Sequence, residues 1–311
     1  MVDGHANGGV RPADSVAAVL ESVEPSVLAI IAGVEGPSYR PFGAMMALFP
    51  DGRRVGSLSS GCIESDISLH AAEALESGAT RMVRYGLGSP FIDIQLPCGG
   101  GLDILLVPRP DRDALARVQQ ARQARRAVTM TVGRESGAIT ITADGSPGLH
   151  SDRLAVRIEP EIRFLVFGKG PEAVTFAALS HSVGFPTMLL SPDAETLDSA
   201  LCATSSLTSK SVPEDLAIDD RTAVVLFFHD HDWEPPLLAT ALRTPAFYVG
   251  AQGSRRAREA REHELRGMGV GEEAIGRLRG PIGLVPSARD PRTLAVSVLA
   301  EVLATAKPTL G

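Results

Sequence analysis

Residues 164–190 read FLVFGKGPEAVTFAALSHSVGFPTMLL, and this stretch decides the fold of the second half of the chain. The apolar run 164–167 has the length of a buried strand and ends at a glycine, and the segment from Pro171 to about Val183 is helical in character. A second apolar run follows at 187–190. This order predicts a strand, a helix and a second strand parallel to the first.

Gly168, Gly170 and Ala173 match the pattern G-x-G-x-x-A at the turn between the first strand and the helix. In that pattern the first glycine turns the chain and the second lets the backbone approach a pyrophosphate. The small third residue allows the helix to pack on the strand. The sequence therefore predicts a Rossmann-like domain with a mainly parallel sheet.

Nucleotide binding by this domain is a separate question from its architecture. Glu172 places a negative charge in the first helical turn, where a phosphate would sit, and the second strand is followed by Ser-Pro-Asp at 191–193 rather than by a carboxylate at its tip. Both features weigh against ribose and pyrophosphate recognition. A scaffold that keeps its glycines for packing alone is the competing interpretation.

Two later apolar runs, 223–228 and 246–249, are also followed by polar segments, and the carboxyl ends of parallel strands are where open α/β sheets bind ligands. After the first run, His229 and Asp230 are candidate ligand contacts; His229 and the histidine two residues on would point to opposite faces, which is poor geometry for one metal ion. After the second run, Gly253, Ser254 and Arg255 suit an anion site of backbone N–H groups and a guanidinium. A solvated helix start explains those three equally well.

The first half of the chain carries two cysteines in loops that contain glycine. Cys62 follows Gly61 at the start of an expected helix that ends at Gly78, so the helix dipole favours its thiolate, which is a soft ligand and a nucleophile. Cys98 precedes three glycines between expected strands 92–96 and 102–107, where backbone N–H groups can approach an anion closely. Inert packing is the alternative for both cysteines, and it is our interpretation of Cys202, which lies in an expected helical stretch.

The remaining pattern divides the chain into two domains. A helix at 13–24, a strand at 27–31 and a hairpin of 44–49 with 55–58 predict a mixed α/β fold for the first half. A segment rich in Gly, Ser, Pro and Asp then marks a boundary. We therefore expect an N-terminal mixed α/β domain over 1–152 and a C-terminal Rossmann-like domain over 153–311.

Composition narrows the possible partners. The 311 residues carry a net charge of −7 and no long basic run, which argues against a nucleic-acid partner. The sequence has neither an apolar leader at its start nor an uninterrupted apolar stretch of about 18 residues, so we expect no membrane partner and a cytoplasmic location. Three cysteines in a chain of this length argue against a disulfide framework.

Taken together, eight segments resemble the XdhC/CoxI family of xanthine dehydrogenase accessory proteins over nearly the full length. They are GPSYRPFG at 36–43, VGSLSSGCIE at 55–64, PCGG at 97–100, FGKGPEA at 167–173, HDHD at 229–232, YVGAQGSRR at 248–256, GPIGL at 280–284 and AVSVLAEVL at 295–303. None of them is specific alone.

The resemblance implies a chaperone that binds the molybdenum cofactor (molybdopterin), holds it during sulfuration by a cysteine desulfurase, and delivers it to a molybdenum hydroxylase of the xanthine dehydrogenase type. Such a protein has no catalytic turnover of its own, and a homodimer is the default assembly. On this match Cys98 is the leading contact to molybdenum and Cys62 the second. The other expected cofactor-binding positions, with a nucleotide in the Rossmann cleft as a further expectation, are Arg40, Gly61, Glu64, Gly99, Gly100, Gly168, Gly170, His229, Asp230, Gly253, Ser254 and Arg255.

Two other functions compete with the chaperone. An NAD(P)-dependent oxidoreductase would use Gly168 and Gly170, but the sequence offers no strand-end carboxylate and no obvious proton donor. A regulatory protein would bind a nucleotide through the Rossmann-like domain and control a partner enzyme. Nucleotide binding separates both from a chaperone whose ligand is the molybdenum cofactor.

Overall fold

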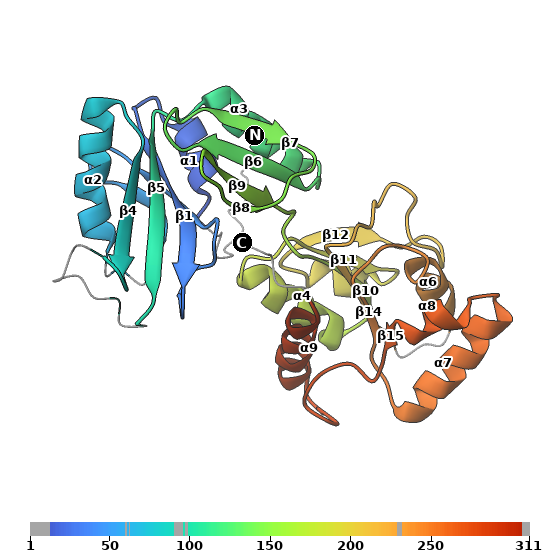
Figure 1. Ribbon diagram of the computed structural model, residues 1–311. Helices are drawn as coiled ribbons and strands as arrows, with labels where there is room; N and C mark the ends of the chain where they lie inside the picture. Colours follow the sequence, from blue (N-terminus) through green and yellow to red (C-terminus); the bar gives the residue numbers. More distant parts are fainter. Residues whose placement is uncertain are drawn as a thin grey trace, which may run out of the picture. The chain divides into compact units, whose positions relative to one another are not determined.

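A computed structural model describes residues 13–59, 61, 63–89, 96, 99–228 and 232–306. These residues form two compact units, one ending at Pro160 and the other beginning at Glu161. The first is a mixed α/β unit and the second is a Rossmann-like unit with a parallel sheet, which confirms the expected fold class (Figure 1).

The first unit is built on a five-stranded antiparallel sheet in the order β3-β2-β1-β5-β4. Apolar residues of the central strand β1 alternate between two separate cores, because successive side chains point to opposite faces. Its strands are β1 (Val27–Glu35), β2 (Met45–Leu48), β3 (Arg54–Gly56), β4 (Arg81–Gly86) and β5 (Gly101–Pro108). The expected strand 92–96 falls on residues that, apart from Leu96, lie outside the described part of the chain.

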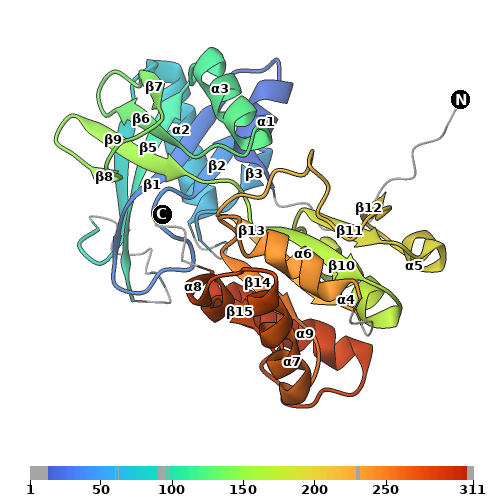
Figure 2. The same cartoon turned by 90° about the vertical axis from the view of Figure 1, so that its right-hand side faces the viewer.

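Helix α2 (Glu64–Ser77) covers one face of this sheet and ends at Gly78, whose φ is +68°. The other face is covered by two helices and a four-stranded antiparallel sheet, which pack on it through one continuous core (Figure 2). These elements are α1 (Ser15–Glu21), α3 (Arg112–Gln123), β6 (Val128–Gly133), β7 (Ile139–Thr142), β8 (Gly148–Leu149) and β9 (Arg153–Ile158).

Strand β9 lies on the far side of the boundary expected at 152/153. It pairs with β6 from Val128↔Ile158 to Gly133↔Arg153, and its Leu154 and Val156 are buried in the core of the first unit. The first unit therefore continues through β9 to Pro160, and the Gly/Ser/Pro-rich segment before β9 is a surface connection inside it.

The second unit contains a six-stranded sheet in the order β12-β11-β10-β13-β14-β15, and every neighbouring pair is parallel. This is the strand order of dinucleotide-binding folds, in which the order reverses between the first and the fourth strand. The strands are β10 (Arg163–Gly168), β11 (Thr187–Ser191), β12 (Ala203–Ser206), β13 (Thr222–Phe227), β14 (Tyr248–Ala251) and β15 (Leu278–Arg279).

Helices cover both faces of the parallel sheet. Helices α4 (Pro171–Ser182) and α9 (Pro291–Thr305) pack side by side on one face, and α6 (Glu234–Ala241), α7 (Arg255–Gly267) and α8 (Glu272–Gly276) pack on the other (Figure 1). No helix among the described residues is long and apolar enough to cross a membrane.

The expected helix around Cys202 is wrong. Helix α5 (Ala194–Asp198) ends before this residue, and Cys202 directly precedes the edge strand β12. Its thiol is half-buried, and burial raises its pKa. Cys202 is therefore a poor nucleophile, as the packing interpretation requires.

Candidate functional site

The three motif-bearing segments of the first unit leave its large sheet at the same edge. By this edge we mean the one formed by the last residues of β1, β3 and β4 and the first residues of β2 and β5. Glu35 and Gly86, the last residues of β1 and β4, both lie opposite Gly101, the first residue of β5. Gly56, the last residue of β3, lies opposite Met46 near the start of β2. Because all these pairs are antiparallel, the segments that meet at this edge are 36–44, 57–63 and 87–100.

Close backbone packing joins the first and third of these segments. A Cβ atom on Gly100 would lie 2.2 Å from the carbonyl oxygen of Pro37 and 2.8 Å from that of Glu35. Both neighbours are backbone atoms, so a side chain at position 100 would force the segments apart. The glycine after PCG is therefore required for contact with the GPSYRPFG segment.

A shared apolar core joins the second and third segments. Leu58 and Ile63 flank the position of Cys62 and are fully buried, and Leu96, two residues before Cys98, is 6% exposed. All three belong to the core under α2, together with Tyr85. Cys62 and Cys98 themselves lie outside the described residues, so what the structure adds is the arrangement of the residues around them.

Glu64, the first residue of α2, turns its carboxylate back onto the segment before the helix. It accepts hydrogen bonds from the N–H of Ser59 at 2.9 Å, from the hydroxyl of Ser59 at 2.7 Å and from the N–H of Ile63 at 3.2 Å. Glu64 is itself buried, with 8% of its surface exposed. It thus links Ser59, at the end of the segment before Cys62, to Ile63, the residue after it.

These contacts also set the charge state of Glu64. Burial alone would raise the pKa of its carboxyl, but the hydrogen bonds from Ser59 and from the backbone outweigh burial, and the pKa lies below its ordinary value. The sequence placed Glu64 among the cofactor contacts, whereas its oxygens are bound to its own loop. Ser59 was missed as its partner, because the capping box, in which a first-turn Glu reaches backward, places that Glu three residues after its partner, whereas Glu64 lies five residues after Ser59.

Arg84 ties together the three strand ends that carry the first and third segments. Its guanidinium donates to both oxygens of Asp103 on β5, at 3.1 and 2.9 Å, and to Glu35 at the end of β1. Its Nε donates to the Leu87 carbonyl at 2.8 Å. The two carboxylates, Asp103 before Glu35, raise the pKa of Arg84. The sequence pattern did not single out this cluster.

Arg40 lies in the first of these segments and could bind an anionic ligand. Its side chain is exposed and donates to the carbonyl of Tyr39 at 3.2 Å, and it forms no ion pair within the part of the chain that the structure describes. The neighbouring predicted glycines are partly committed already: the N–H of Gly61 donates to the Ser59 hydroxyl and that of Gly99 to the Leu96 carbonyl. Among these three residues, the Arg40 guanidinium is therefore more available to an anion than the N–H groups of Gly61 and Gly99.

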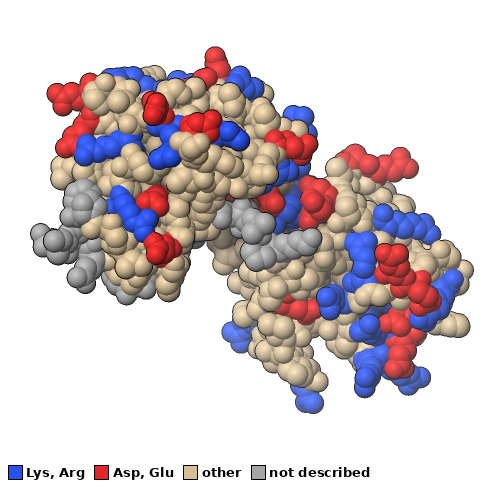
Figure 3. Space-filling model, viewed as in Figure 1, with Lys and Arg blue, Asp and Glu red and all other residues tan. Residues whose placement is uncertain are grey.

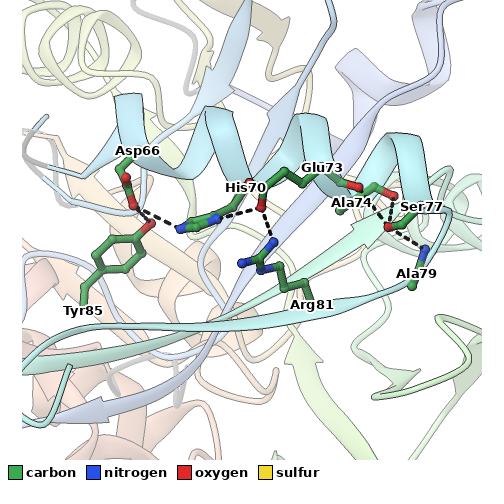
Figure 4. Close-up of polar contacts among 8 residues, drawn as sticks. All are labelled: Asp66, His70, Glu73, Ala74, Ser77, Ala79, Arg81 and Tyr85. Carbon is green, nitrogen blue, oxygen red and sulfur yellow. Dashed lines mark hydrogen bonds and ion pairs between the residues drawn. The ribbon is translucent and has the colours of Figure 1, made fainter. Parts of the chain in front are cut away.

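A chain of polar side chains runs between α2 and the edge strand β4 (Figure 4). The hydroxyl of Tyr85 donates to Asp66 at 2.6 Å, and His70 lies 3.3 Å from Asp66 and 3.2 Å from Glu73, which pairs with Arg81. Burial, and then the hydrogen bond to Asp66, raise the pKa of Tyr85, so its phenol stays a donor. These contacts link α2 to β4 through side chains.

In the second unit, the glycines of the G-x-G-x-x-A motif allow close packing of strands, and a side chain of the same unit occupies the turn between them. A Cβ on Gly168 would lie 2.6 Å from the carbonyl oxygen of Phe227, so this glycine permits the contact between β10 and β13. The N–H of Gly170, whose φ is +79°, donates to the hydroxyl of Thr196 at 2.9 Å, and that hydroxyl donates to Asp193 at 2.5 Å. A backbone donor at the turn where this fold binds a pyrophosphate is thus already bonded.

The other predicted contacts of this unit lie at the end of β14. Gly253 has a φ of +139°, and Ser254 caps α7 by accepting the N–H of Ala257 at 3.2 Å. Arg255 is exposed and forms no ion pair with any described residue. His229 and Asp230 lie outside the described residues.

Among the residues that the structure describes, no group of three or more His, Cys, Asp or Glu side chains could hold a metal ion.

Basic and acidic side chains are interspersed over α7 on the face that Figure 3 shows. One example is the ion pair between Arg258 and Glu262 at 2.7 Å.

The chain is similar to known proteins over both units. It matches the XdhC and CoxI family over residues 19–86 and the XdhC Rossmann domain over residues 164–302. It is 33% identical to the molybdenum cofactor insertion chaperone PaoD of Escherichia coli, over 91% of this chain and 84% of PaoD. It is 25% identical to a Bacillus subtilis protein described as a probable xanthine dehydrogenase subunit, over 93% and 96% of the two chains.

A solved structure, that of a protein described as a xanthine dehydrogenase from Bacillus halodurans, has the same fold. It superposes with a TM-score of 0.74 at 22% identity and covers 95% of this chain and 97% of that one. The matched motifs, the identity to PaoD across both units and the shared architecture lead to one conclusion: this chain belongs to the XdhC and CoxI family.

Proposed function

We propose that this protein is a molybdenum cofactor insertion chaperone that receives the cofactor at the glycine-rich edge of its first unit. The observation that carries the proposal is the meeting of segments 36–44, 57–63 and 87–100 at one edge of the large sheet. These segments contain Cys62 and Cys98 and belong to a chain that is 33% identical to PaoD.

The chemistry of the cofactor suits the residues of that edge. Molybdenum held by a dithiolene is a soft centre, for which Cys98 and Cys62 supply thiolate ligands. The pterin carries a phosphate, for which the exposed guanidinium of Arg40 supplies a cation without a carboxylate partner among the described residues. Glu64 acts on the ligand indirectly, by fixing the loop that leads to the helix.

We propose that the recipient is a molybdenum hydroxylase of the xanthine dehydrogenase type, and that this protein would hold the cofactor during its sulfuration by a cysteine desulfurase. We further propose that the protein acts as a homodimer. These steps rest on the family resemblance and on the similarity to PaoD and to the Bacillus subtilis relative.

Equilibrium binding of molybdenum cofactor to the full chain tests the proposal. Cys98→Ala should weaken binding at least about tenfold, which corresponds to the loss of roughly 1.4 kcal/mol of binding free energy. Cys202→Ala is the matched control, because its thiol is half-buried in the other unit, and it should bind as the unaltered chain does.

The same titration distinguishes the competing functions. No cofactor binding together with tight NAD binding would refute the chaperone and favour an oxidoreductase or a nucleotide-dependent regulator. The bond from Gly170 to Thr196 leads us to expect weak NAD binding.

A further inference from the structure

A groove with a volume of about 520 Å³ lies between α2 and the hairpin of β2 and β3 in the first unit. One helix is too narrow to cover a five-stranded sheet, since strands lie about 4.8 Å apart and a helix is about 10–12 Å wide. Helix α2 packs on β1 and β5 (Figure 1). The adjoining ends of β2 and β3 are therefore left as a hollow beside the helix, with α2 as one wall and the hairpin as the other.

The two walls of the groove differ in charge. On the hairpin wall, the guanidinium of Arg53 lies 3.7 Å from the centre of the Phe49 ring and also pairs with Asp51. Arg54, on the same wall, is exposed and forms no ion pair with any described residue. On the helix wall, Glu76 is exposed and is likewise unpaired within the described part of the chain. One cation and one anion are thus available on opposite walls.

The rest of the groove is mostly apolar. Leu48 and Leu75 line it and also pack in the core under α2. Leu69, on the helix wall, has 65% of its surface exposed, and its neighbours on the lining are the small residues Ser68 and Ala72. A protruding leucine therefore stands next to an apolar hollow, and such exposed apolar surface with a polar rim is typical of sites of protein association.

This one surface carries both members of two complementary pairs: a protruding leucine and an apolar groove, an unpaired anion and an unpaired cation. A two-fold interface requires this property, because the same patch faces itself. A small apolar ligand would leave Arg54 and Glu76 unpaired, and a partner of one charge sign would be repelled by one wall. A second copy of this chain satisfies both pairs.

We infer that this protein forms a two-fold dimer through the groove, with Leu69 of each copy in the groove of the other and Glu76 of each copy facing Arg54 of the other. The groove lies where β2 ends and β3 begins, at the edge of the sheet opposite to the cysteine loops. Both cofactor edges therefore stay accessible in the dimer. The dimer surface rests on the homodimer of the proposed function, and its small size predicts a dissociation constant of roughly 1–100 μM.

Sedimentation equilibrium of the full chain, at concentrations on both sides of this value, tests the dimer surface. Leu69→Glu should weaken the dimer at least about tenfold, because each interface loses two buried leucines and gains two charges in apolar surroundings. Leu201→Glu is the matched control, since Leu201 is 68% exposed but lies in the second unit, and it should leave the dissociation constant unchanged. An unaltered chain that stays monomeric, or a dimer that Leu69→Glu does not weaken more than the control, would overturn the assignment and leave the groove to a different occupant.

Charge reversal tests the two-fold arrangement. Arg54→Glu and Glu76→Arg should each weaken the dimer about threefold to tenfold at low ionic strength, since each places two pairs of like charges in the interface. An equimolar mixture of the two variants should restore the affinity of the unaltered chain, because both contacts of the mixed dimer then join opposite charges. A contact within one chain could not be restored by mixing, so a mixture that stays weak would refute the pairing of Arg54 with Glu76 between copies.

Cofactor binding keeps this dimer surface apart from the chaperone proposal. The monomeric Leu69→Glu variant should bind molybdenum cofactor as the unaltered chain does, and so should a chain with a group attached at the β2–β3 turn, which borders the groove. A dimer that persists in Leu69→Glu, with normal cofactor binding, overturns the surface alone. A dimer that behaves as expected in every variant but binds no cofactor supports the surface and refutes the chaperone.

Discussion

In each unit a guanidinium pairs with a carboxylate at one edge of the sheet, and the two pairs differ in burial. At the edge of the first unit, Arg84 meets Asp103 at 2.9 Å with 29% of its side chain exposed. At the edge of the second, Arg261 meets Glu234 at the same distance with 3% exposed. The shortest N–O distances are equal, but Arg84 pairs with a second carboxylate, Glu35, and the two arginines differ in burial.

The difference in burial indicates which of the two edges is more rigid. An ion pair near water is screened and contributes up to about 1 kcal/mol, whereas removing one partner of a buried pair costs roughly 3–5 kcal/mol, since a buried charge is left behind. The edge at Gln252, whose carbonyl accepts a hydrogen bond from Arg261 at 2.6 Å, is therefore held as firmly as a core, while the edge around Arg84 can adjust at small cost. A bulky ligand that is bound and then released requires an edge that can adjust.

Arg261→Met should produce the largest change, because it keeps most of the side-chain volume but leaves Glu234 buried without this cation. We expect the free energy of unfolding of the second unit to fall by about 3–5 kcal/mol. Urea unfolding followed by Trp233 fluorescence reports this unit selectively, since the chain has one tryptophan. Arg266→Met on the same helix, where the partner Glu272 is exposed, is the control and should change little. Equal effects of the two variants would remove the comparison.

Gly100→Ala should have the next largest effect, because the added Cβ meets backbone oxygens of Pro37 and Glu35. We expect a loss of about 1–3 kcal/mol in the first unit, the range typical of forced overpacking, and at least tenfold weaker cofactor binding. Hydrogen exchange across β4 and β5 measures the first effect.

Gly52→Ala separates the clash from backbone strain. Gly52 has a φ of +85°, but no atom lies within 4 Å of a Cβ at that position. It should cost about 1–2 kcal/mol for the left-handed conformation alone and leave cofactor binding intact. Cofactor binding lost equally in both variants would show that contact with Pro37 is not what the loops require.

Glu64→Gln should destabilise the first unit by about 1–2 kcal/mol at neutral pH, because the amide replaces a charged acceptor of the Ser59 and Ile63 donors. The pKa of Glu64 is lower in the folded than in the unfolded chain. Its stabilisation is therefore complete above the unfolded value of about 4.3 and is lost as the pH falls through the folded value.

The measurement is hydrogen exchange of α2 in the unaltered chain and in Glu64→Gln, between neutral pH and about pH 3, corrected for the intrinsic exchange rate. The difference in stability between the two proteins should be constant at neutral pH and shrink on acidification. A difference that grows as the pH falls would mean that the carboxyl is stabilised in its protonated form.

Arg84→Gln should have the smallest effect on stability, about 1 kcal/mol or less, and that effect should decrease with added salt because the pair is partly exposed. Hydrogen exchange of β4 at low and high ionic strength tests both parts. A loss as large as that in Arg261→Met would show that the first edge is as rigid as the second.

The sequence predicts elements better than side-chain partners in this protein. Gly168, Gly170 and Ala173 locate the first strand, helix and turn of the parallel sheet, because that pattern is local and each residue has its own steric reason. Strand β9 was assigned to the wrong side of the boundary, since its partner β6 lies about 25 residues earlier and the intervening loop resembles a linker.

At the candidate site, too, the sequence predicts the elements but not the side-chain partners. The cysteine loops could be found from their glycines, but the bonds that shape them depend on register and on side-chain direction. Arg84 meets Asp103 because β4 and β5 pair at that position, and no local pattern encodes such a pairing. Thr196 closes the turn at Gly170 from 26 residues away, so the sequence could not show that the fingerprint is occupied.

The two edges of the antiparallel sheet in the first unit differ in how well they should tolerate an attached group. The segments that we propose receive the cofactor all leave one edge, whereas the turn at Asp51 and Gly52 joins β2 to β3 at the opposite edge, where both residues are exposed. A fluorophore, an affinity tag or an inserted reporter domain attached at this turn would be separated from the cysteine loops by the full length of the strands. The turn is therefore a suitable attachment point for tethering the protein in a test of the proposed cofactor transfer.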